Sequence, residues 1–146
     1  LADALTLADE DQPDTLICMA TLTGAARVAL GPDIAPFYTG DDDFAGEIAE
    51  AANVEADPVW RLPLWPAYDA WLSSPVADLD HIAKNGFAGS IVAALFLNRF
   101  VEKTARFAHF DIFGWAPEDR PAAPKGGEAQ AIRALFHALA RRYLTD

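Results

Sequence analysis

The sequence has one cysteine, few basic residues and no long apolar run. Cys18 lies within an apolar segment, so we expect a buried, reduced thiol and no intrachain disulfide, as in cytoplasmic proteins. The 11 Lys and Arg residues against 22 Asp and Glu residues give a net charge of −11, which disfavours nucleic-acid binding. Apolar stretches stay below the roughly 18 residues of a membrane span, and the acidic first segment is unlike a basic export signal. We therefore expect neither a nucleic-acid nor a membrane partner.

Motifs that carry chemistry are also missing. The three histidines lack metal-ligand spacing, and the short acidic clusters at 41–43, 78–81 and 117–119 are more typical of solvated loops than of cation sites. The serines have no nucleophile-elbow context, and no glycine-rich loop has phosphate-binding spacing. His109 is expected to be a half-buried, hydrogen-bonded residue of a strand. From its residues alone, the chain therefore has a core and no identifiable catalytic group.

What the sequence does contain is an alternation of strand-like apolar runs and helix-like amphipathic segments. Strands are expected at 15–21, 34–40 and 105–114. Helices are expected over residues 1–10 and at 24–31, 42–54, 89–103 and 126–144. This order predicts one α/β domain over 1–146, with a mixed, largely parallel sheet flanked by helices.

An aromatic segment, VWRLPLWPAYDAWL at 59–72, interrupts the alternation. It contains three tryptophans and a tyrosine and is broken by two prolines. Such density is more typical of a core and a subunit contact than of a cofactor site. We therefore expect an oligomer.

Two loops are placed where ligands usually bind in α/β proteins, beyond the carboxyl ends of strands. TLTGA at 21–25 follows the first strand and offers hydroxyls together with a glycine that permits close approach to the main chain. FGWAPED at 113–119 follows the third strand and has side chains that could form a pocket wall. Pattern alone leaves open whether each is a substrate rim or a simple turn.

Five stretches of the chain resemble the leucyl (cytosol) aminopeptidase family in order and spacing. They are LADAL (1–5), MATLTGAARVALG (19–31), VWRLPLWPAY (59–68), GFAGSIVAALFLNRFV (86–101) and AHFDIFGWAP (108–117). Each is modest alone, but five in order with matching gaps are specific. The resemblance implies the C-terminal portion of the catalytic domain of a hexameric, metal-dependent enzyme that removes N-terminal residues from peptides.

The resemblance places the metal centre outside this chain. The family signature N-T-D-A-E-G-R-L-x-L-A-D-A-L has its metal-binding Asp and Glu, and the Arg that holds a catalytic bicarbonate, ahead of the position matched by Leu1. Two divalent ions, zinc or manganese, are therefore implied for the parent protein and none for this chain. No catalytic residue is assigned here, and the isolated chain is expected to be inactive.

The resemblance does assign substrate-binding residues to this chain. Thr21 would line the pocket for the first side chain of the peptide, while the Leu22 carbonyl and the Gly24 amide would bind its backbone. Phe113 and Ala116 would form the second wall, at positions where the family usually has Ala and can have Met. We expect the larger Phe113 to narrow the pocket. The TLTGA loop would then be both a turn and a substrate rim.

A rival interpretation comes from another functional class. An α/β binding or assembly module could keep this scaffold without the metal centre, and the 146 residues alone do not discriminate the two. The residues encoded upstream of Leu1 would do so, because D-x-E-G-R directly before Leu1 supports the enzyme.

Overall fold

The structure is a computed structural model that describes residues 1–82, 84–121 and 123–144. The helices are α1 (Ala2–Glu10), α2 (Arg27–Leu30), α3 (Asp42–Glu55), the 3-10 helix η1 (Pro66–Leu72), α4 (Gly89–Asn98) and α5 (Ile132–Tyr143). The strands are β1 (Leu16–Ala20), β2 (Ala35–Tyr38), β3 (Val59–Arg61), β4 (Phe107–Asp111), β5 (Trp115–Ala116) and β6 (Gly126–Gly127). Over these residues, no helix is long and apolar enough to cross a membrane.

The main sheet has four strands in the order β1-β4-β2-β3, so the last long strand of the chain lies in its interior. β4 is parallel to β1 and antiparallel to β2, and β2 is parallel to β3. This mixed, mostly parallel sheet with flanking helices confirms the predicted fold class. All five residues of β4 are buried, as expected for a strand covered on both faces.

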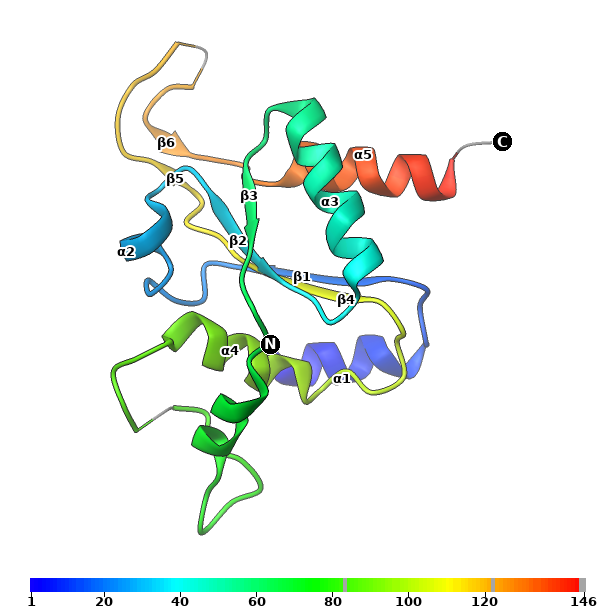
Figure 1. Ribbon diagram of the computed structural model, residues 1–146, viewed down its shortest axis with the longest axis vertical. Helices are drawn as coiled ribbons and strands as arrows, with labels where there is room; N and C mark the ends of the chain where they lie inside the picture. The colour runs from blue at the N-terminus through cyan, green and yellow to red at the C-terminus, as the bar shows by residue number, and fades with distance from the viewer. Residues whose placement is uncertain (83, 122, 145–146) are drawn as a thin grey trace.

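Helices cover both faces of the sheet (Figure 1). α3 and α5 pack on one face, where Phe37, Phe44, Ile48, Phe110 and Leu135 form the main core. α1 and α4 lie on the other face, below β1 and β4 in Figure 1. Their core includes Leu5, Cys18, Leu97 and Phe107. Cys18 is buried and unpaired, and burial raises the pKa of its thiol.

Three predicted helices are shorter than the sequence pattern indicated, including the one expected at 89–103. The helix expected at 24–31 comprises only Arg27–Leu30, and residues 24–26 form bends and a turn ahead of it. The helix expected at 126–144 begins at Ile132, since Gly126 and Gly127 pair with β5 instead. Gly126 has φ of +145°, a backbone conformation that suits glycine and not a helix.

Buried aspartates set the ends of several segments. Asp57 is 4% exposed, and its carboxylate accepts hydrogen bonds from the amides of Ala131, Arg133 and Ala134 at the start of α5. The Asp9 carboxylate likewise accepts hydrogen bonds from the amides of residues 102–104. These residues follow α4, which ends at Asn98, although the sequence pattern predicted helix up to residue 103. Burial opposes ionisation of Asp9, but these bonds hold its pKa well below the usual value.

Candidate functional site

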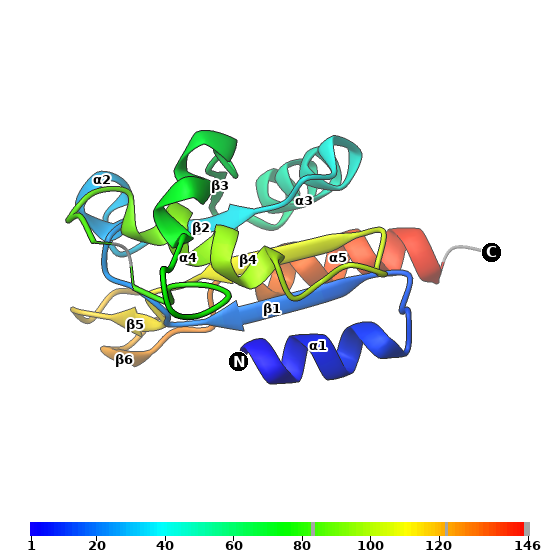
Figure 2. The same ribbon diagram turned by 90° about the horizontal axis from the view of Figure 1, so that it is seen from below.

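The two loops singled out in the sequence lie at the same edge of the sheet. β1 and β4 are parallel neighbours, with Ala20 level with Asp111, so the segments that follow them leave the sheet side by side. α2 and the β5–β6 hairpin gather at this end of the molecule (Figures 1 and 2). We call the segments 21–25 and 112–116 the two rim loops.

Asp111, the last residue of β4, fixes the first rim loop. Its Oδ1 accepts hydrogen bonds from the amides of Leu22 at 2.9 Å and Thr23 at 2.8 Å. Its Oδ2 accepts from the Thr23 hydroxyl and from Ser90 Oγ at 2.7 Å. The carboxylate is 3% exposed, so four donors compensate its burial. These bonds fix the backbone of residues 22 and 23 beside the end of β4.

The bonds to Asp111 continue inward through Ser90 to Tyr38. The Tyr38 hydroxyl donates to Ser90 Oγ at 2.6 Å, and Tyr38 is 1% exposed. Burial raises the pKa of Tyr38 to about 12, the nearby Asp111 carboxylate adds to the rise, and the bond to Ser90 opposes it. The phenol therefore stays protonated and keeps donating at neutral pH.

This buried phenol makes a testable contribution to stability at high pH. The ordinary pKa is 10.0 and the folded one about 12, so the folded state retains the proton longer than the unfolded chain. The stabilisation, about 3 kcal/mol, is complete below pH 10 and lost as pH rises through 12. Urea unfolding from pH 9 upward should show this decline, and Tyr38→Phe should reduce its slope. An equal slope in both proteins would contradict the assignment.

Gln130 fixes the second rim loop. Its side-chain oxygen accepts from the amides of Phe113 and Gly114, both at 2.9 Å, and its side-chain nitrogen donates to the Pro32 carbonyl at 2.7 Å. Gln130 is 5% exposed and precedes α5. A single buried amide therefore joins the second rim loop, the segment after α2 and the start of the last helix.

The rim loops also contact each other. Gly114 has φ of +66°, and a Cβ placed on it would lie 3.2 Å from the Thr21 methyl group. Arg27, which begins α2, stacks its guanidinium on the Phe113 ring with 4.4 Å between the Cζ atom and the ring centroid. A glycine at 114 thus satisfies both the backbone and the close approach of the loops.

The five predicted substrate-binding residues differ in accessibility. Thr21, Leu22 and Gly24 are exposed, Phe113 is half-buried, and Ala116 is 3% exposed within the β5–β6 pair. The first three therefore present a surface to solvent, whereas the Ala116 side chain is buried.

The described residues do not by themselves fit a metal pair. Among residues 1–82, 84–121 and 123–144, no group of three or more His, Cys, Asp or Glu side chains is placed to hold a metal ion. Asp111, whose carboxylate binds the first rim loop, already accepts four hydrogen bonds. Of the acidic clusters, Asp41 caps α3 by accepting from the Phe44 amide, and Asp80 pairs with Lys84.

His109 differs from its prediction. The side chain is fully buried, whereas the sequence predicted a half-buried and hydrogen-bonded residue. Within the described part of the chain, neither ring nitrogen has a hydrogen-bond partner. Its ring stacks on that of Tyr38 with centroids 6.0 Å apart. Burial lowers the pKa of His109, although the Asp111 carboxylate opposes this, so the ring is neutral.

Sequence reasoning missed the residues that position the rim. The sequence motifs assign no role to Ser90, Tyr38 and Gln130, and Asp111 appears only within the AHFDIFGWAP motif. A signal was available for Asp111, because a carboxylate in an otherwise apolar strand needs compensating donors. Which donors those are depends on strand order.

An α/β domain with two anchored rim loops beyond adjacent parallel strands is a typical ligand-binding scaffold. Residues 1–136 match the catalytic domain of the cytosol aminopeptidase family, and the chain belongs to that family. A probable cytosol aminopeptidase of Synechococcus sp. (strain JA-3-3Ab) is 45% identical over 137 residues, which cover 92% of this chain and 26% of the relative.

Solved structures are similar too. The cytosol aminopeptidase of Coxiella burnetii is 48% identical with a TM-score of 0.92, over 97% of this chain and 31% of that one. The bottromycin maturation enzyme BotP in complex with Mn is 34% identical with a TM-score of 0.89, over 97% and 32% of the two chains. The chain thus spans about a third of these structures and about a quarter of the Synechococcus relative.

Proposed function

We propose that this chain is the C-terminal portion of the catalytic domain of a longer, metal-dependent aminopeptidase, and that it supplies the substrate rim. Family membership supports the activity. The observation that carries the role of this portion is the anchoring of two rim loops at one edge of the sheet by Asp111 and Gln130.

The rim has the groups that a peptide needs. Asp111 takes the amides of Leu22 and Thr23 and leaves the Leu22 carbonyl and the Gly24 amide among the backbone groups available to a substrate. Thr21 and Phe113 come from the two loops and would receive the first side chain of the peptide. Fixed positions for these groups reduce the entropy lost when substrate is oriented.

The divalent ions of the proposed enzyme, zinc or manganese, would be held by residues of the longer protein that precede this chain. The neighbouring BotP structure is a complex with Mn, which supports manganese as one candidate. The metal supplies the hydrolytic chemistry of such enzymes. The residues of this chain would bind and orient the peptide.

The isolated chain and the longer protein should therefore behave differently. With aminoacyl-anilide substrates, the isolated chain should release no product with either manganese or zinc, because its described residues do not fit a metal pair. The longer protein should show metal-dependent, chelator-sensitive release. Turnover by the isolated chain would overturn the division of roles, and no turnover by the longer protein would favour the non-catalytic module.

Phe113 should set the width of the pocket. In the longer protein, Phe113→Ala removes most of a half-buried side chain at the second rim loop and should favour bulky N-terminal residues over alanine by about 1–3 kcal/mol. The measurement is the ratio of kcat/KM for Leu and Phe substrates to that for Ala. A ratio unchanged by the substitution would mean that the Phe113 ring does not face the substrate.

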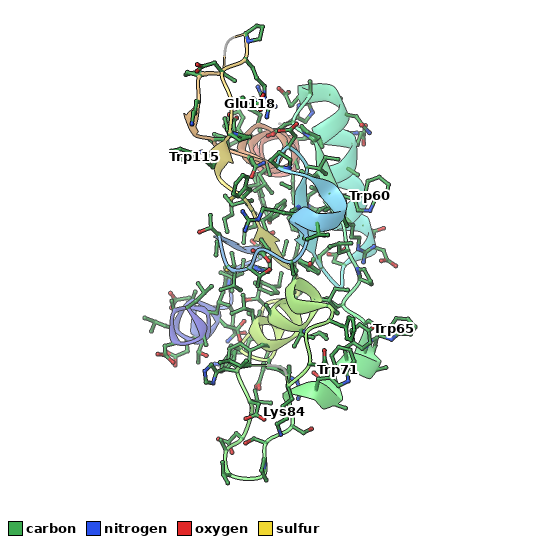
Figure 3. All side chains as sticks on the ribbon, turned by 90° about the vertical axis from the view of Figure 1, so that its left-hand side faces the viewer. Trp60, Trp65, Trp71, Lys84, Trp115 and Glu118 are labelled. Carbon is green, nitrogen blue, oxygen red and sulfur yellow. The ribbon has the colours of Figure 1, made fainter. Side chains whose placement is uncertain are left out.

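The proposed enzyme is a homo-oligomer, a hexamer by its family resemblance, and acts in the cytoplasm. Exposed tryptophans support the assembly. Trp60 is 59% and Trp65 53% exposed, and both lie along the edge opposite Trp115 in Figure 3. Tyr68 and Trp71 instead stack on each other, with ring centroids 4.1 Å apart. The aromatic segment thus serves both the core and an exposed surface suited to a subunit contact.

A further inference from the structure

Arg27 lies between the two rim loops. It begins α2, and its guanidinium covers the ring of Phe113 in the second rim loop. The same guanidinium turns back over the first rim loop, since a Cβ placed on Gly24 would lie 2.5 Å from one of its terminal nitrogens. One cationic group therefore contacts the pocket wall and the backbone position that would bind substrate.

Arg27 also differs from the other arginines in its partners. The seven others each form an ion pair with a carboxylate, namely Arg61, Arg99, Arg106, Arg120, Arg133, Arg141 and Arg142. Within the described part of the chain no carboxylate pairs with Arg27, although acidic residues outnumber basic ones by 22 to 11. Among the described residues, its one close charge-related contact is the face of Phe113.

An exposed guanidinium on an aromatic ring is available to an anion. The cation–π contact uses the face of the guanidinium, and its N–H groups point outward in the guanidinium plane, where they can donate to a carboxylate. A carboxylate that arrives beside Phe113 would gain charge-assisted hydrogen bonds without displacing an existing ion pair. A cationic side chain at the same place would be repelled.

We propose that Arg27 is a specificity-determining residue that favours peptides with an N-terminal aspartate or glutamate over those with lysine or arginine. The proposal rests on the proposed function, because it assigns the first side chain of the substrate to the space beside Phe113. The side-chain carboxylate of the substrate would accept hydrogen bonds from Arg27 while the Phe113 ring contacts its methylene groups.

The test uses the longer protein and aminoacyl-anilides of Glu, Leu and Lys. Anilides have no C-terminal carboxylate, so any selectivity for negative charge must come from the first side chain. We expect Arg27→Gln to lower kcat/KM for Glu relative to Leu about tenfold, and to raise it for Lys relative to Leu. Arg27→Lys, which keeps the charge, should retain most of the preference for Glu over Lys.

A matched control removes the same charge at the other end of the sheet. Lys103 is exposed and lies before the start of β4, away from the rim, so Lys103→Gln should leave the Glu to Leu ratio unchanged. Raising the salt concentration should reduce the Glu preference of the unmodified enzyme, because exposed charges are screened. Circular dichroism and thermal unfolding of each variant check that it is folded.

Each outcome bears on one proposal. Loss of the Glu preference in Arg27→Gln but not in Lys103→Gln supports the role of Arg27. A Glu to Leu ratio that Arg27→Gln does not change, or an unmodified enzyme that prefers Lys to Glu, overturns that role while leaving the aminopeptidase intact. Absence of turnover with all three anilides would instead refute the proposed function.

Discussion

Asp111→Ala should lower the kcat/KM of the proposed longer enzyme about 100-fold, because misplacement of positioning groups by about an ångström has an effect of that size. The substitution removes the acceptor for the amides of Leu22 and Thr23 and for two hydroxyls. Without it the first rim loop loses the bonds that orient the Leu22 carbonyl and the Gly24 amide. Steady-state kinetics with a Leu anilide measure the loss.

Two further variants separate positioning from charge. Asp111→Asn keeps one oxygen that can accept from both loop amides, so its loss of activity should be smaller. Asp119→Ala removes an exposed acidic residue near the second rim loop and should leave kcat/KM unchanged. If folded Asp111→Ala has the activity of the unmodified enzyme, the rim does not depend on this carboxylate.

Asp57→Ala should destabilise the protein by about 3 kcal/mol, since it leaves three donors at the start of α5 without their charged acceptor. The residue that precedes α5 is Ala131, whose side chain cannot cap the helix. Hydrogen exchange should therefore accelerate first at the amides of Ala131, Arg133 and Ala134. Urea unfolding gives the total effect.

The matched control is Glu50→Ala on α3. Glu50 is 61% exposed and pairs with Arg141 of α5, so it also links α3 to α5, but across solvent. We expect a loss of at most about 1 kcal/mol. An Asp57→Ala loss no larger than that of Glu50→Ala would show that α5 is held by its apolar face, including Leu135, and not by the buried cap.

Local pattern was sufficient for the elements that form the core. The runs at 15–21, 34–40 and 105–114 contain β1, β2 and β4, because short apolar runs fit strands covered on both faces. The helix predicted at 42–54 starts at the first residue of α3 and ends one residue before the last, since Asp41 caps the helix locally through the Phe44 amide. Motif order, in addition, was sufficient to identify the family.

Pattern failed where a distant residue decides the local structure. β3 is three residues long with two exposed positions, so it has little hydrophobic pattern of its own, and its pairing with β2 makes it a strand. The sequence pattern predicts helix over 126–131. In the structure, Asp57, which lies 74 residues from Ala131, fixes the start of α5 instead. Helix propensity is a weak preference that such contacts override.

The sequence by itself determined an α/β fold and its family, and it predicted two loops for a peptide substrate. Only the tertiary structure decided how those loops are held and that Arg27 stands over Phe113. The physical reason is the range of the interactions. Asp111 binds Leu22 from 89 residues away and Gln130 binds the Pro32 carbonyl from 98, so neither bond leaves a periodic trace in the sequence near its partner.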